Sequence, residues 1–163
     1  MTRRLIVMRH AKSSWDSAAR SDHDRVLSGR GRRDAPRVGA ALVEGGWIPD
    51  LVLSSDSQRT RETFAGLSKA FPSKVEACFL PSFYHDGPGA VQAELPGVPE
   101  HVACLLVLGH NPGWESLVEW LSGEDIVMKT ATAALLAMDL GDWSESIQPG
   151  KWNLKGVIYP REL

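Results

Sequence analysis

Two short apolar runs, each ending at a histidine, constrain the fold of this chain most strongly. Residues 5–8 are all apolar and lead directly into Arg9 and His10, and a second run, 103–109, leads into His110. Apolar runs of this length, bounded by polar residues, are typical of strands buried on both faces of a parallel sheet. In open parallel sheets, ligands bind beyond the carboxyl ends of the strands. The sequence therefore predicts two histidines at the ligand-binding edge of one sheet.

The rest of the chain alternates between predicted strands and predicted helices. Besides the strand that ends at Arg9, strands are predicted over 50–55, 75–80, 103–108, 133–140 and 153–159. Helices are predicted over 31–45, 56–71, 90–95 and 112–123, with Ser28 as the cap of the first and Gly123 ending the last. Residues 13–25 and 81–89 have no period and are predicted to be loops. This alternation predicts an α/β fold, a three-layer α/β/α sandwich with a mostly parallel central sheet. Because the chain has 163 residues, we expect one domain spanning 1–163.

Composition excludes several classes of function. The formal net charge is −2, whereas a general nucleic-acid binder would carry a basic excess. No apolar run approaches the ~20 residues of a membrane span, and no signal peptide is evident, so we expect a cytoplasmic protein. Cys78 and Cys104 both lie in apolar runs and are predicted to be buried. Neither cysteine is spaced from a histidine as zinc ligands are, so no metal site is predicted.

A third strand end adds a further cation to the predicted edge. Arg59 falls in the first turn of the helix that follows strand 50–55, so it is expected near Arg9, His10 and His110. Two arginines can clamp phosphoryl oxygens through charged hydrogen bonds. A neutral histidine can act as a covalent nucleophile, and His10 is the better candidate because it follows Arg9 on a rigid strand. His110 would then donate a hydrogen bond to the transferring group.

These residues lie in motifs that resemble those of a known family. The motifs are Met-Arg-His-Ala at 8–11, Ser-Ser-Asp-Ser-Gln-Arg-Thr-Arg-Glu-Thr at 54–63 and Gly-His-Asn-Pro-Gly at 109–113. Together they resemble the signature of the histidine phosphatase superfamily, which has the phosphoglycerate-mutase-like fold. The segment 22–31 and the short length are most similar to its branch of SixA-type phosphohistidine phosphatases. The resemblance extends over essentially the whole chain.

The resemblance implies a role for each matching residue. It implies that His10 is the nucleophile that becomes phosphorylated and that Arg9, Arg59 and His110 form the rest of the phosphate pocket. It also implies that the enzyme uses neither a metal nor an organic cofactor. One departure is Ala11, because the superfamily usually has glycine there. Alanine is small, so we expect little effect unless this position needs a positive φ.

This sequence departs from the larger members of the superfamily in the residue that would donate a proton to the leaving group. Larger members of the superfamily place an acidic residue after the third strand, where it protonates an alcohol leaving group. Here that region offers Tyr84, His85 and Asp86 without a clear match. A phosphohistidine substrate makes a missing acid tolerable, because an imidazole can leave already protonated.

The sequence therefore favours a phosphatase that removes phosphate from histidine on a partner protein. The enzymatic alternative is a phosphomonoesterase acting on a small phosphorylated metabolite, with Asp86 or His85 as its acid. The non-enzymatic alternative is a module that binds phosphoproteins without hydrolysing them. Arg20 is a candidate substrate-binding residue, provided that loop 13–25 folds over the pocket.

Overall fold

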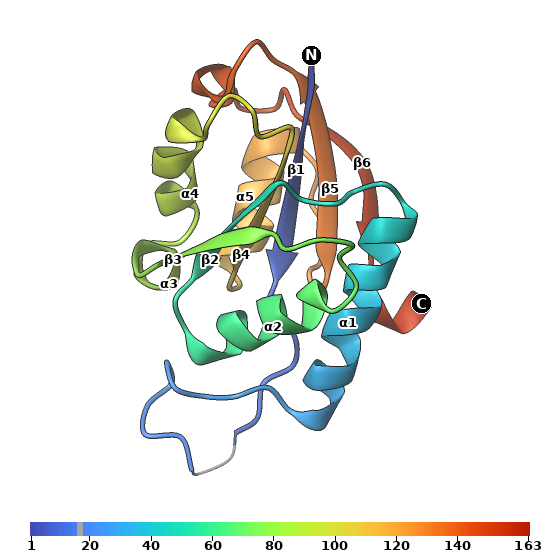
Figure 1. The fold of residues 1–163 in the computed structure, drawn as a ribbon. Coiled ribbons are helices and arrows are strands. Elements are labelled where there is room, and N and C mark those ends of the chain that lie inside the picture. The colour runs from blue at the N-terminus through green and yellow to red at the C-terminus, as the bar shows by residue number, and fades with distance from the viewer. Residues whose placement is uncertain (16–17) are drawn as a thin grey trace.

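A six-stranded sheet forms the centre of the fold in the computed structural model, which describes residues 1–15 and 18–163 (Figure 1). The strands are β1 Thr2–Arg9, β2 Leu51–Ser55, β3 Glu76–Leu80, β4 Cys104–Gly109, β5 Ala133–Asp139 and β6 Asn153–Ile158. The helices are α1 Gly29–Glu44, α2 Gln58–Ser68, α3 Ser82–His85, α4 Pro88–Glu94 and α5 Gly113–Ser122, with single-turn 3₁₀ helices η1 Leu95–Gly97, η2 Trp143–Glu145 and η3 Pro160–Glu162. The strand order is β3-β2-β4-β1-β5-β6. The first four strands in this order are parallel, β5 pairs antiparallel with β1, and β6 pairs antiparallel with β5. The predicted mostly parallel α/β sheet is confirmed.

Pairing of β1 with β4 places the two histidines at the same edge. The parallel register runs to Arg9 opposite Gly109, so His10 and His110 are the next residues on adjacent strands. The backbone N–H of His10 donates to the carbonyl of Gly109 at 3.0 Å, which extends the pairing by one residue. Ser55 ends β2, the other neighbour of β4, at the same edge.

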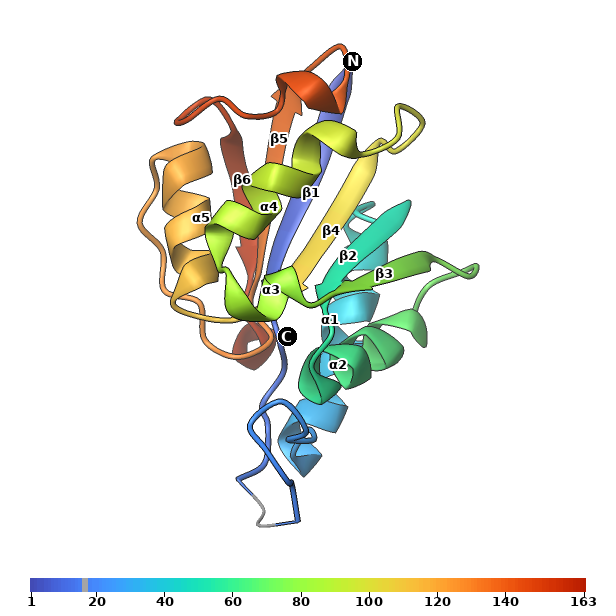
Figure 2. The same ribbon diagram turned by 90° about the vertical axis from the view of Figure 1, so that its left-hand side faces the viewer.

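Helices cover both faces of the sheet, and two separate apolar cores result. Figure 2 shows α3 and α4 in front of the sheet and α1 behind it. The buried residues of α5 join the core on the α4 side, and those of α2 join the core on the α1 side. Alternate residues of one strand enter different cores: Leu5 belongs to the same core as Trp114 of α5, whereas Ile6 belongs to the same core as Val38 of α1. A strand buried on both faces needs apolar residues throughout, which is why residues 5–8 form a continuous run.

The ends of the helices follow side-chain capping rules. The hydroxyl of Ser28 accepts the N–H of Gly31 at 3.2 Å, so the predicted cap of α1 is confirmed. Gly123 ends α5 with φ +78°, as expected for a residue that leaves a helix in the left-handed region. The helix predicted over 56–71 is shorter than expected, because Ser57 caps it and its regular turns end at Ser68.

Two expectations about β3 and its surroundings are wrong. The predicted loop 81–89 contains the single-turn helix α3 and the start of α4, which are too short to show a helical period. Cys78 is exposed, because β3 is the edge strand of the sheet, whereas Cys104 is buried as expected. Among the described residues, no helix is long and apolar enough to cross a membrane.

Candidate active site

His10 lies at the end of β1 and is 7% exposed. Its Nδ1 is 2.7 Å from the carbonyl oxygen of Ala11. Because a carbonyl oxygen can only accept, Nδ1 carries the proton and donates. The lone pair of a neutral His10 is therefore on Nε2, the ring nitrogen that can attack an electrophile.

The protonation state of His10 suits a nucleophile. Burial, the largest cause, lowers the pKa of His10 to about 3, and the ring of His110 and the charges of Arg59 and Arg9 act in the same direction. The hydrogen bond to Ala11 opposes this shift without cancelling it. At neutral pH the ring is therefore uncharged, and its lone pair is available.

His110 faces His10 from the end of β4, with 5.2 Å between the ring centroids. Its Nε2 lies 2.9 Å from the hydroxyl oxygen of Ser55, and its Nδ1 lies 3.4 Å from a terminal nitrogen of Arg59. A guanidinium only donates, so Nδ1 accepts and Nε2–H donates to Ser55. Burial, followed by the charge of Arg59, lowers the pKa of His110 to about 4. Both rings are therefore neutral at physiological pH.

Arg59 reaches the two histidines from the first turn of α2. The hydroxyl of Thr63, one turn further along α2, donates to the carbonyl of Arg59 at 2.7 Å and accepts the N–H of Ala11 at 3.0 Å. This one side chain therefore fixes α2 against the residue that follows His10. The buried Nε of Arg59 has no hydrogen-bond partner among the described residues, so this donor can serve an incoming phosphoryl oxygen.

Arg9 supplies the second cation of the cluster. One of its terminal nitrogens donates to the carbonyl of Met128 at 3.0 Å, and its buried Nε has no partner in the described part of the chain. Burial is the main cause that lowers the pKa of Arg9. The charge of Arg9 contributes to the lowered pKa of both His10 and His110, which places it within electrostatic reach of the two rings. The structure thus brings together all four residues that the strand ends predicted.

Asp22, which the sequence analysis did not single out, binds the cluster from the loop that follows β1. Its backbone carbonyl accepts from Arg59 at 2.7 Å and its carboxylate accepts from Arg59 at 3.0 Å. The same carboxylate accepts the hydroxyl of Tyr84 at 2.7 Å and a terminal nitrogen of Arg25 at 2.9 Å. These hydrogen bonds, that of Tyr84 first, hold the pKa of Asp22 well below its usual range. Its place in the segment 22–31 was the available signal, but no period or spacing connects it to Arg59.

Tyr84 is the residue of α3 that reaches the site. Its ring lies edge-on to His110, with 5.5 Å between centroids, and desolvation followed by the hydrogen bond to Asp22 raises its pKa. The candidate acids beside it, His85 and Asp86, do not join the cluster. His85 and Asp86 are exposed, and within the described residues neither is hydrogen-bonded to the histidines or to Arg59.

Arg20 does not join the four predicted residues. It is exposed and lines a hollow with Ser14, Ala19 and Asp24, among other loop residues, and this hollow includes neither histidine. Loop 13–25 nevertheless reaches the site through Asp22. Asp16 and Ser17, which belong to the same predicted loop, lie outside the described residues.

The geometry determines what this arrangement can do chemically. It combines one neutral imidazole whose Nε2 can attack, a second neutral imidazole and two guanidinium groups. Guanidinium groups stabilise charge on phosphoryl oxygens, and phosphoryl transfer depends mainly on alignment and charge stabilisation.

Ala11 has no positive φ, so alanine replaces glycine there without backbone strain. Among the described residues, no group of three or more histidine, cysteine or acidic side chains could hold a metal ion.

A family model and a relative from a plant match this chain. The family model of the histidine phosphatase superfamily (branch 1) matches residues 5–78. An uncharacterized protein from Arabidopsis thaliana, described as chloroplastic, is 40% identical over 173 residues, which cover 98% of this chain and 79% of the relative. Because that relative is described as chloroplastic, the cytoplasmic location expected here stays a prediction.

Solved structures of two kinds of phosphatase share the fold. A candidate phosphohistidine phosphatase SixA from Nakamurella multipartitia is 26% identical, with a TM-score of 0.85 and coverage of 98% of this chain and 97% of that one. A mycobacterial glucosyl-3-phosphoglycerate phosphatase is 20% identical, with a TM-score of 0.65 and coverage of 95% and 98%. The second likeness concerns the fold alone.

Proposed function

Because the chain belongs to the histidine phosphatase superfamily, within its SixA-like branch, we propose that it removes phosphate from phosphohistidine on a protein. In this proposal His10 becomes transiently phosphorylated. The observation that carries the proposal is the pair of neutral imidazoles, 5.2 Å apart at adjacent strand ends, with Arg59 beside them.

The first step is attack of His10 Nε2 on the phosphorus of the substrate. The bond between phosphorus and the substrate nitrogen breaks, and the substrate imidazole leaves with the electron pair of that bond. Arg9 and Arg59 stabilise the charge on the phosphoryl oxygens, and the carbonyl of Ala11 holds His10 in the tautomer that attacks. A water molecule then attacks the phosphorus of phosphorylated His10. The bond between phosphorus and Nε2 breaks, its electron pair returns to Nε2, and the proton that the water loses leaves with the inorganic phosphate or passes to solvent.

The leaving group favours nitrogen–phosphorus cleavage over ester cleavage. An alkoxide needs a proton donor, whereas an imidazole can leave already protonated. The carboxylate nearest Arg59 is Asp22, and its hydrogen bonds keep it ionised, so it is a poor acid. The two candidate acids of the phosphomonoesterase alternative, His85 and Asp86, are exposed and bond none of the four clustered residues in the described structure.

The test compares two substrates and two variants. Wild-type protein, His10→Ala and the exposed-site control His101→Ala are each incubated with a phosphohistidine-containing peptide and with a panel of sugar phosphates. We expect wild type and the control to release phosphate from the peptide and to form an acid-labile phosphoenzyme. We expect neither with His10→Ala.

Each outcome bears directly on the proposal. Activity that survives in His10→Ala would exclude the covalent mechanism. Faster turnover of a sugar phosphate, lost in Asp86→Asn or His85→Asn, would favour the phosphomonoesterase. Peptide binding without phosphate release would favour the binding module.

A further inference from the structure

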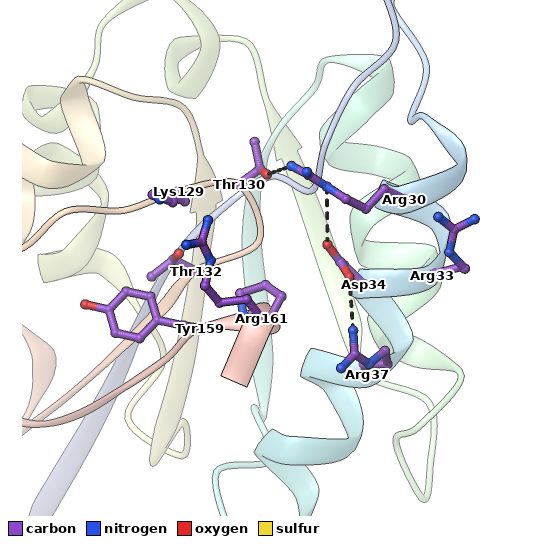
Figure 3. Close-up of a pocket in the computed structure, with 10 residues that line it drawn as sticks. Arg30, Arg33, Asp34, Arg37, Lys129, Thr130, Thr132, Tyr159 and Arg161 are labelled. Atoms are coloured by element: carbon purple, nitrogen blue, oxygen red, sulfur yellow. Dashed lines mark hydrogen bonds and ion pairs between the residues drawn. The ribbon is translucent and has the colours of Figure 1, made fainter. Parts of the chain in front are cut away.

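A basic groove lies beside the active site and is not used by the reaction proposed above. It has a volume of about 410 Å³ and lies between α1, the segment 129–132 and the C-terminal residues 159–161. Figure 3 shows arginines of α1 on one side and Lys129, Tyr159 and Arg161 on the other. A second hollow of about 200 Å³ shares these last three residues and is also lined by Val127 and Glu162.

The groove gathers positive charge in a chain that is slightly acidic overall. The formal net charge of the whole chain is −2, yet five cationic side chains and one carboxylate line the larger hollow. The cationic side chains are those of Arg30, Arg33, Arg37, Lys129 and Arg161. Asp34 pairs with Arg37 at 3.3 Å and lies 4.0 Å from Arg30. Arg37 also donates to an oxygen of the C-terminal Leu163 at 2.7 Å. Arg33, Lys129 and Arg161 have no ion pair within the described residues, so three of the five cations are not paired with an acidic side chain of the protein.

The floor of the groove is bonded directly to the catalytic strand. The carbonyl of Thr132 accepts the N–H of Arg9 at 3.0 Å, and the N–H of Ala131 donates to the carbonyl of His10 at 2.9 Å. A ligand in the groove therefore lies beside the segment that positions the nucleophile. The hydroxyl of the buried Thr132 has no partner among the described residues, so the floor also offers an unused hydrogen-bonding group.

We propose that this groove binds an extended acidic segment of the phosphorylated protein whose phosphohistidine enters the active site. The inference rests on the function proposed above. An extended occupant is favoured because the cations of the groove come from three separate segments, and because a second hollow adjoins it at Lys129, Tyr159 and Arg161. Exposed arginine side chains bind carboxylates through paired hydrogen bonds, and complementary charge also accelerates the encounter of the two proteins.

The test uses synthetic peptides and charge-reversal variants. The substrates are phosphohistidine peptides with a run of glutamates on the amino side, on the carboxyl side or replaced by serines, together with free phosphohistidine. The test variant is Arg33→Glu/Arg161→Glu, and the matched control is Lys69→Glu/Lys155→Glu, which reverses two exposed lysines outside the groove. Arg33→Ala/Arg161→Ala serves as a milder pair if charge reversal impairs folding.

We expect wild type at low salt to show a KM about tenfold lower for one of the acidic peptides than for the serine peptide. The test variant should lose this preference, and the control should keep it. Turnover of free phosphohistidine should stay within about twofold of wild type in both variants, because the four catalytic residues are untouched. Raising NaCl to 0.5 M should shrink the preference. Equal KM values for all peptides in wild type, or a preference that persists in the test variant, would overturn the proposal.

A binding measurement separates this proposal from the proposed function. Fluorescence anisotropy of unphosphorylated, labelled acidic peptides needs no turnover. Groove-dependent binding without hydrolysis of any phosphohistidine substrate would support the docking surface and reject the phosphatase. Hydrolysis with no groove-dependent binding would support the phosphatase and reject the docking surface. If inorganic pyrophosphate binds at the groove and the acidic peptides do not, the groove is a compact phosphate site, and the proposal fails.

Discussion

At the scale of single residues, the site holds two neutral histidines where burial and nearby cations oppose their protonation. The pKa of His10 is lowered to about 3 and that of His110 to about 4. Each lowered pKa keeps an imidazole uncharged at neutral pH, so its lone pair is available, but it also makes the folded state sensitive to acid. The same property that suits catalysis therefore has a consequence for stability.

The first prediction concerns stability below neutral pH. Between the unfolded pKa of about 6.5 and the folded pKa of about 3, the unfolded chain binds a proton at His10 and the folded chain does not. Stability is therefore full above this window and falls as the pH is lowered through it. His10→Asn keeps a donor for the Ala11 carbonyl but does not titrate. From pH 7 to pH 4.5 we expect the variant to lose roughly 2 kcal/mol less free energy of unfolding than wild type.

Urea unfolding at both pH values measures the difference. His101→Asn, which replaces an exposed histidine, is the control and should lose as much stability as wild type. Equal losses in His10→Asn and wild type would contradict the buried, neutral state assigned to His10.

The second prediction compares neighbouring arginines on α2. Arg59 lies 3.4 Å from His110, whereas Arg61 is exposed, bonds the carbonyl of Asp56 and lies over the ring of Phe79. We expect Arg59→Ala to lower kcat/KM for a phosphohistidine peptide by about 10²–10³, because it removes a preorganised donor for the transition-state charge. Arg61→Ala should change it by less than about twofold. Steady-state kinetics would contradict the assignment if the two losses were alike.

At the scale of elements, close packing of α1 against α2 positions Arg59. A Cβ at Gly39 of α1 would lie 2.6 Å from the carbonyl oxygen of Leu67 in α2, so the two helices meet at this distance only because Gly39 has no side chain. Gly66 of α2 allows the same close approach from the other helix, because a Cβ added there would lie 2.6 Å from the Cβ of Ala35. Because α2 carries Arg59, the separation of these helices also sets the geometry of the site.

The third prediction concerns the replacement of glycine by alanine at two sites, where we expect opposite effects on stability. Gly39→Ala should destabilise the protein by about 1–3 kcal/mol, because the helices must move apart. Gly89→Ala should stabilise it by up to about 1 kcal/mol, because Gly89 lies in α4 with nothing within 4 Å of the added carbon and alanine favours helices. Urea unfolding measures both. A higher free energy of unfolding in Gly39→Ala than in wild type would show that the α1–α2 contact accommodates a methyl group without strain.

Elements with strong local signals were predictable from the sequence, and those set by distant contacts were not. The continuous apolar run before His10 and the hydroxyl of Ser28 each determine structure within a few residues, so β1 and the start of α1 were predicted. The exposure of Cys78 depends on which strand lies at the edge of the sheet, which no local pattern records. Asp22 meets Arg59 across 37 residues of chain, so its contact with the site also lacked a local signal.

At the scale of the whole molecule, the fold concentrates positive charge at one edge of a chain with a formal net charge of −2. Arg9 ends β1, Arg59 lies in α2, and the two histidines directly follow β1 and β4. Arg59 lowers the pKa of Arg9 and of both histidines, Arg9 lowers that of both histidines, and His110 lowers that of His10. Holding these groups together costs folding free energy, which a bound anion would offset. Anion binding should therefore stabilise the folded protein as a whole.

The final prediction separates the active site from the basic groove by thermal stability. Orthovanadate, a compact phosphate mimic, should raise the Tm of wild type by roughly 5–10 °C at a hundred times its Kd, since such binding contributes about 2.7 kcal/mol. Arg59→Ala should lose most of this shift, because it removes a donor of the site that binds vanadate. Arg33→Glu/Arg161→Glu should keep the shift, because its changes lie only in the groove. Loss of the shift in the groove variant alone would place the phosphate site in the groove and would contradict the assignment of His10, His110 and Arg59 as its centre.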